Sequence, residues 1–160
     1  MDELIPLIRE RLEAGQTVKF SPKGISMLPM LRQGRDSVVL AKPPERLRKY
    51  DVPLYVRPDG KYLLHRVIAV EQDNRYTCMG DNLFEREEGI LHSEVIAVVV
   101  AFTRDSKMIP VSRLSYRLYC RFWYAVKPFR RLLRGVKNRL SRLFRVNRDE
   151  NGQAGAGPQR

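Results

Sequence analysis

Residues 62–70 read Tyr62-Leu63-Leu64-His65-Arg66-Val67-Ile68-Ala69-Val70, an apolar run that contains one histidine and one arginine. β-Branched and aromatic residues of this kind favour strands. Side chains alternate between the two faces of a strand, so His65 shares a face with Leu63, Val67 and Ala69, and Arg66 points to the other face. The stretch therefore predicts a β-strand that places a histidine in apolar surroundings.

Other segments of strand-like composition lie on both sides of this run, and they predict a mainly β domain. They cover residues 17–20, 37–40, 54–56, 76–79 and 95–102. Pro, Gly and Asp/Asn clusters separate them, as expected for turns. Pro58-Asp59-Gly60 has the residues of a tight hairpin turn, and Gln72-Asp73-Asn74 offers a second. We expect a β-meander or a small barrel.

A short amphipathic helix is predicted ahead of the strands. Leu4, Ile5, Ile8 and Leu12 recur at helical spacing, and Gly15 is suited to the end of the helix. The first residues lack the basic start and apolar run of a signal peptide. The longest apolar run, 95–102, is far shorter than the roughly 20 residues of a membrane span. We therefore expect a cytoplasmic chain, with Cys78 and Cys120 as free thiols.

The positive charge of the chain is concentrated towards its C-terminus. Residues 1–103 carry 15 basic and 15 acidic residues, whereas residues 104–148 carry 14 basic residues and only Asp105 as an acid. We predict three parts: a domain at 1–103, a basic amphipathic helical tail at 104–148, and a disordered terminus at 149–160, where small polar residues prevail.

The tail has an apolar stripe at helical spacing. It comprises Leu118, Phe122, Val126, Phe129, Leu133, Val136, Leu140 and Leu143. Arginines flank the stripe, and Pro128 should kink or divide the helix. This composition is typical of an interfacial helix on an anionic membrane, so we predict peripheral membrane association through residues 114–148. Packing of the helix on the domain and binding to nucleic acid are the alternatives.

One loop segment and one histidine could form a catalytic pair. Residues 22–31, Pro-Lys-Gly-Ile-Ser-Met-Leu-Pro-Met-Leu, place the hydroxyl of Ser26 among apolar neighbours. A serine needs a base to remove its proton, and His65 is suited to that role. Burial disfavours the imidazolium and so lowers the pKa of His65, which keeps the ring neutral. A hydrogen-bonded core histidine would fit the same pattern.

Three motifs together resemble the type I signal peptidases. They are Gly24-x-Ser26-Met27-x-Pro29-x-Leu31-x-x-Gly34, His65-Arg66-Val67-Ile68 and Gly80-Asp81-Asn82, in the order and approximate spacing of that family. The similarity spans about residues 17–102. A histidine before an arginine is similar to the endoplasmic-reticulum-type and some Gram-positive enzymes, whereas other bacterial enzymes and LexA-like repressors use a lysine. The resemblance implies the signal peptidase/LexA-like β-fold.

The resemblance also implies roles for individual residues. Ser26 would be the nucleophile, His65 the general base, and Asp81 the acid that orients His65, although Asp81 could equally be a turn residue. Many family members place a serine hydroxyl two residues before the nucleophile as an oxyanion donor. Gly24 occupies that position here, so the second donor stays unassigned. No cofactor is implied, and the two histidines and two cysteines lack the spacing of a zinc site.

The predicted function is a serine endopeptidase that cleaves a peptide or precursor protein at or near the membrane. The absence of a leader or anchor is unusual for this family and suggests processing inside the cell. The alternative is a catalytically silent peptidase-fold adaptor whose basic tail binds anionic membrane or nucleic acid. Cleavage of a peptide would distinguish the two.

Overall fold

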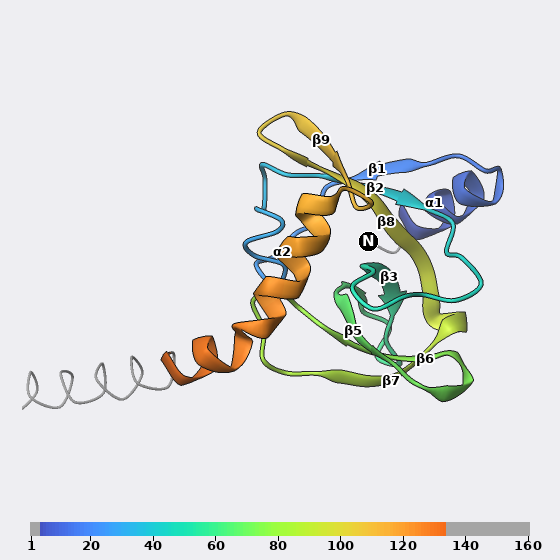
Figure 1. Cartoon of the computed structure of the whole chain (residues 1–160). Coiled ribbons are helices and arrows are strands. Elements are labelled where there is room, and N and C mark those ends of the chain that lie inside the picture. Colours follow the sequence, from blue (N-terminus) through green and yellow to red (C-terminus); the bar gives the residue numbers. More distant parts are fainter. Residues whose placement is uncertain (1–3, 134–160) are drawn as a thin grey trace, which may run out of the picture. The chain divides into compact units, whose positions relative to one another are not determined.

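The computed structural model describes residues 4–133 of the 160-residue chain. Within that range the chain is mainly β, with two antiparallel sheets and a few helices (Figure 1). The expected mainly β class is confirmed. The strands form two separate sheets, however, and neither a barrel nor a single meander. The chain divides into two units, Met1–Cys120 and Arg121–Arg160.

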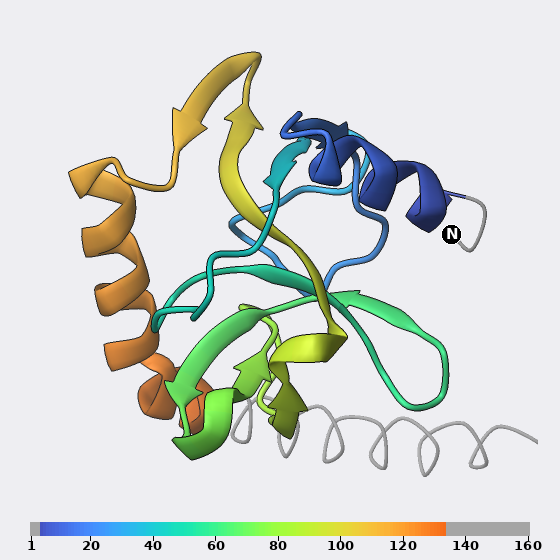
Figure 2. The same cartoon turned by 90° about the vertical axis from the view of Figure 1, so that its right-hand side faces the viewer.

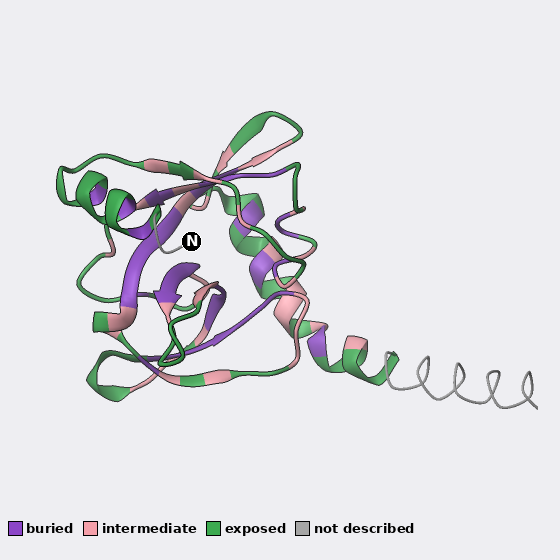
Figure 3. Cartoon of the chain, turned by 180° about the vertical axis from the view of Figure 1, so that it is seen from behind, coloured by how far each residue is buried: buried purple, intermediate pink, exposed green. Residues whose placement is uncertain are grey.

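The larger sheet has six strands, and β8 runs through its centre. Its order is β1 (Val18–Phe20), β2 (Val38–Ala41), β8 (Val95–Arg104), β3 (Pro53–Val56) and β4 (Tyr62–Leu64), with β9 (Lys107–Pro110) also paired to β8. β8 is ten residues long and mostly buried, as the purple ribbon in Figure 3 shows. The longest apolar run of the sequence thus becomes the strand that joins both halves of the sheet.

The smaller sheet is a three-stranded meander of β5 (Arg66–Val70), β6 (Arg75–Met79) and β7 (Glu87–Leu91). Only His65 separates β4 from β5, so the single strand expected at 62–70 is instead two strands that belong to different sheets. His65 therefore lies where the chain passes from one sheet to the other.

Two tight hairpins shape the larger sheet. The predicted Pro58-Asp59-Gly60 turn joins β3 to β4, with Gly60 at φ 78°. A second hairpin joins β8 to β9 through Asp105 and Ser106, which have φ angles of 49° and 65°. Positive φ at both central residues is the backbone of a type I′ turn, which matches the twist of paired strands. The predicted turn at Gln72–Asn74 is a single 3₁₀ turn between β5 and β6.

The expected N-terminal helix is α1 (Leu4–Glu13; Figure 2). It buries Ile5, Ile8 and Leu12. These side chains join the main core beneath the larger sheet. A second core lies around the smaller sheet and includes Tyr55, Val67 and Tyr76. Leu47 is part of this second core, so the loop before β3 is anchored there.

The domain continues beyond the predicted end at residue 103. β9 pairs with β8, and α2 (Leu114–Ala125) buries Tyr116 and Cys120 in the main core. The segment from 104 is therefore not helical throughout, because the Asp105-Ser106 turn returns the chain to the sheet as β9. Both cysteines are free thiols, as predicted, and both are buried.

In the second unit, the helix is interrupted at Val126 and resumes over residues 127–133. The division predicted at Pro128 is thus confirmed, because proline is accommodated in the first turn of a new helix. Among residues 4–133 no helix combines the length and the apolar character needed to cross a membrane. The rest of the predicted tail and the terminus at 149–160 lie outside the described residues.

Candidate active site

Ser26 lies in the long loop between β1 and β2. Its neighbours Met27, Met30 and Leu31 are 4%, 2% and 3% exposed, so their side chains anchor the loop in the main core. Ser26 itself is half-buried, and Ile25 is exposed. The buried apolar side chains therefore hold the backbone of the segment in place and leave Ser26 accessible at the surface. This agrees with the fixed, partly buried loop that its composition suggests.

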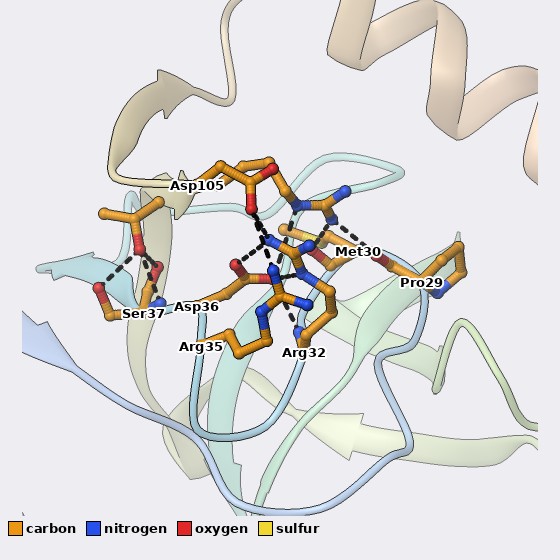
Figure 4. A network of polar contacts seen from close by, with 9 residues as sticks. Pro29, Met30, Arg32, Arg35, Asp36, Ser37 and Asp105 are labelled. Carbon is orange, nitrogen blue, oxygen red and sulfur yellow. Dashed lines mark hydrogen bonds and ion pairs between the residues drawn. The ribbon is translucent and has the colours of Figure 1, made fainter.

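An arginine–carboxylate network ties the end of this loop to the β8–β9 hairpin (Figure 4). Arg32 donates to both oxygens of the buried Asp36 carboxylate at 2.8 and 2.9 Å, and also to Asp105 at 2.8 Å. Arg104 of β8 donates to the carbonyl oxygens of Pro29 and Met30 at 2.7 and 2.6 Å. The Arg32 guanidinium holds the pKa of Asp36 below its usual value. Charge-assisted bonds of this kind fix the loop that carries Ser26.

The Gly80-Asp81-Asn82 segment holds Ser26 from the other side. The backbone N–H of Asn82 donates to the Ser26 carbonyl at 2.9 Å, and its side-chain amide donates to the Ile25 carbonyl at 3.3 Å. A Cβ atom on Gly80 would lie 2.7 Å from the Ser26 carbonyl oxygen, too close for any side chain. Glycine is therefore needed at 80 so that the two backbones can approach.

Asp81 forms a fully buried ion pair with Arg66. Its two oxygens accept from Nε and Nη2 of Arg66 at 2.8 and 2.7 Å, and both side chains are 0% exposed. The remaining Arg66 donors reach the Tyr50 carbonyl, the Tyr116 hydroxyl and the sulfurs of Cys120 and Met30. Arg66, which the sequence places on the strand face opposite His65, is thus a core residue. That face is covered by α2 and by the segment where the chain passes from β4 to β5.

His65 is 3% exposed, and its Nδ1 atom faces two oxygen groups. The Tyr55 hydroxyl and Glu87 Oε1 each lie 3.4 Å from Nδ1, and the Tyr55 hydroxyl donates to Glu87 Oε2 at 2.9 Å. Burial lowers the pKa of His65, as predicted, while the charges of Glu87 and Asp81 oppose this effect. The ring is therefore held neutral at pH 7, which is the state a general base needs.

Two carboxylates act on His65: Asp81, the acid predicted to orient it, and Glu87. Both oxygens of the Asp81 carboxylate accept from Arg66, and the charge of Asp81 also raises the pKa of His65. The carboxylate next to Nδ1 is Glu87 of β7, with Tyr55 of β3 beside it. Neither residue was identified from the sequence. Glu87 follows Glu85 and Arg86 in a charged stretch without strand alternation, so only its pairing with β6 could have indicated it.

Ser26 and His65 are connected through Gly80. Arg66 is paired with Met79, so His65 and Gly80 are the next residues along the two antiparallel strands, and Gly80 touches Ser26. Among the described residues no hydrogen bond joins the Ser26 hydroxyl to the His65 ring. In free enzymes catalytic hydrogen bonds are often long and shorten only when substrate binds. The two residues are thus in one neighbourhood, and no hydrogen bond joins their side chains in the described part of the chain.

A small hollow of about 70 Å³ opens beside Ser26. Its walls include Phe20, Met27 and Leu64 together with Gly24 and Gln33. The Gln33 side-chain oxygen accepts from the Gly24 backbone N–H at 2.9 Å, so the amide nitrogen of Gln33 points away from that bond. The hollow therefore combines apolar walls with the Ser26 hydroxyl and a side-chain amide.

In the described part of the chain no three His, Cys, Asp or Glu side chains gather as a metal site would require. Comparison with protein-family models, with curated proteins and with solved structures found no match to this chain.

Proposed function

We propose that the chain is a serine endopeptidase resembling type I signal peptidase, with Ser26 as nucleophile and His65 as general base. The observation that carries the proposal is the Gly80-Asp81-Asn82 segment, which contacts the Ser26 backbone and continues the strand paired beside His65. A buried histidine with a lowered pKa close to a fixed, accessible serine is the arrangement that acyl transfer requires.

In the proposed reaction the Ser26 oxygen attacks a peptide carbonyl while its proton passes to Nε2 of His65. The tetrahedral intermediate then breaks its C–N bond, and His65 gives the proton to the leaving amine. Water repeats the sequence on the acyl-enzyme, so that the acid product leaves and the Ser26 hydroxyl is restored. Each step uses a proton that His65 can hold and return.

The oxyanion of that intermediate needs preorganised donors. The Ser26 backbone N–H would be the first. The amide nitrogen of Gln33 would be the second, because Gln33 lines the same hollow as Ser26 and its oxygen is already engaged by Gly24. In this proposal the glutamine substitutes for the serine hydroxyl that Gly24 lacks.

The first experiment is labelling with an acylating penem, followed by intact mass measurement. We expect a single adduct on the wild-type chain that is lost in Ser26→Ala and in His65→Ala. Ser21→Ala and His92→Ala are the matched controls, because they remove the exposed serine five residues earlier and the other histidine of the chain. Absence of an adduct on folded wild-type protein would favour the silent adaptor. An adduct that persists in Ser26→Ala would refute the assignment.

A membrane partner is the second part of the proposal, and the outward face of α2 supports it. Leu114, Leu118 and Phe122 are 68%, 55% and 66% exposed, on the helix face opposite the buried Tyr116 and Cys120. Arg117 and Arg121 are exposed on the same helix. A helix that presents apolar side chains to solvent between cations is suited to the headgroup region of an anionic bilayer. We propose that residues 114–148 bind there.

Liposome flotation of the full chain tests the membrane partner. The double variant Leu118→Glu/Phe122→Glu should lose binding to vesicles rich in phosphatidylserine. Met108→Glu, which changes an equally exposed apolar residue on β9, should retain it. Unchanged binding of the double variant would refute insertion of this face. Binding to DNA that ignores the double substitution but falls steeply with salt would favour the nucleic-acid alternative.

A further inference from the structure

We infer that Glu87, together with Tyr55, is the positioning group that sets the tautomer of His65 and stabilises its protonated form, while Asp81 acts as a structural anchor. The inference rests on the proposed function and deepens it. It concerns the Nδ1 side of the ring, where three segments meet: β3 supplies Tyr55, the junction of β4 and β5 supplies His65, and β7 supplies Glu87.

Donor and acceptor accounting determines which ring nitrogen carries the proton. The Tyr55 hydroxyl hydrogen is directed to Glu87 Oε2 at 2.9 Å, so towards Nδ1 the Tyr55 oxygen can only accept. Glu87 Oε1, at 3.4 Å, is a carboxylate oxygen and also only accepts. Two acceptors facing one nitrogen require that nitrogen to be N–H. Nε2 is then left with its lone pair, which is the state that can take the proton of Ser26.

The charges around His65 support the same assignment. Burial lowers the pKa of His65 and Arg57 lowers it further, whereas the charges of Glu87 and Asp81 raise it and so favour the imidazolium. Arg57 lies 3.7 Å from Glu87 Oε2 and so restrains the carboxylate. Arg66 is neutralised by Asp81, and the buried Cys78 thiol, whose pKa is raised to about 12, is uncharged at pH 7. When His65 takes a proton at Nε2, Glu87 is the adjacent charge that balances it.

In this arrangement one proton moves and one stays. The Oγ–H bond of Ser26 breaks and its proton binds Nε2, while the proton on Nδ1 remains there as a donor to the two oxygens. No proton is transferred to Glu87 in this scheme. Its contribution is orientation and electrostatic stabilisation, as for the carboxylate of a Ser-His-acid triad.

The test compares Glu87→Gln with Glu88→Gln, a matched control that neutralises the exposed neighbouring carboxylate. ¹⁵N and ¹H NMR titration of the His65 ring reports its pKa and tautomer, and the rate of Ser26 acylation by the penem is followed over the same pH range. In Glu87→Gln we expect the pKa of His65 to fall, because an adjacent negative charge is removed. The amide of the new glutamine can donate to Nδ1, so the tautomer should reverse.

Acylation should fall by about 10²-fold in Glu87→Gln, in the range of one general-base contribution. Glu88→Gln should match wild type in all three readouts, and Tyr55→Phe, which keeps the carboxylate, should give a smaller loss. An unchanged His65 pKa and tautomer in Glu87→Gln would overturn the inference, and so would a tautomer change produced by Asp81→Asn instead. If Ser26 of the wild type is never acylated, the proposed function fails, and the titration alone still decides the role of Glu87.

Discussion

The substitution Gly80→Ala should displace Ser26 without altering any side chain that could take part in chemistry. The new methyl carbon would lie 2.7 Å from the Ser26 carbonyl oxygen and 3.0 Å from two side-chain carbons of Leu83. Leu83 can move, but the carbonyl is backbone. Close carbon–oxygen contacts begin near ~3.3 Å, so the Ser26 backbone would have to shift by roughly 0.6 Å.

A shift of that size has a measurable cost. Misplacement of a reacting group by 1 Å can cost about 10²-fold in rate, so we expect a loss on the order of 10-fold in penem acylation. Overpacking should also lower the free energy of unfolding by about 1–3 kcal/mol, which urea denaturation measures.

Gly15→Ala is the control for Gly80→Ala, since Gly15 has φ 75° and open space around its Cβ position. It should lower stability through backbone strain and leave acylation unchanged. Acylation of Gly80→Ala at the wild-type rate, under conditions where the variant is folded, would refute the claim that this glycine positions the nucleophile.

Three further predictions concern the charges of the site. Because burial lowers the pKa of His65, acylation of Ser26 should rise with pH and reach half its maximum below about pH 6.5; a midpoint above that value would contradict a buried neutral base. Arg32 lowers the pKa of Asp36, so this carboxylate stabilises the fold above its unfolded pKa of about 3.9 and loses that contribution as pH falls through its folded value. Asp36→Asn should therefore be less stable by about 1.5–3 kcal/mol at pH 7 in urea titrations, and the gap to wild type should close in acid; a gap independent of pH would rule out the charge as its cause. Asp81→Asn leaves Arg66 buried beside a neutral partner and should lower the free energy of unfolding by about 3–5 kcal/mol. A loss below about 1 kcal/mol would show that the ion pair contributes little to stability.

The general architecture could be predicted because it depends on local patterns. The amphipathic spacing of Ile5, Ile8 and Leu12 specifies α1, and the Pro58-Asp59-Gly60 turn specifies the β3–β4 hairpin. Burial of His65 also followed from its apolar neighbours. In each case a period of 3.6 or 2 residues, or a short turn sequence, carries the information within a few residues.

The parts that could not be predicted depend on contacts between distant segments. Alternation assigned Arg66 to the face opposite His65, but Asp81 is 15 positions away and neutralises the guanidinium in the core. β7 and β9 have few apolar residues and form because β6 and β8 offer them a free edge. The domain end predicted at residue 103 also depends on a distant contact. The charge of the sequence changes there, but the chain forms the β8–β9 hairpin at that point and stays in the sheet.

The Gly-Asp-Asn motif shows why recognition of a motif and assignment of its chemistry are separate steps. Gly80 permits close approach to Ser26, Asp81 neutralises Arg66, and Asn82 donates to the Ser26 carbonyl, so each residue has a physical reason that needs no catalytic role. A motif whose residues are needed for geometry indicates where a site lies. The group that faces the histidine can come from any strand that the fold brings to that place. Here that group is Glu87, in a segment without a recognisable pattern. If Asp81→Asn lowers stability with the tautomer of His65 unchanged, and Glu87→Gln reverses the tautomer with little loss of stability, the two carboxylates have separate roles. The reverse result would return the orienting role to the motif.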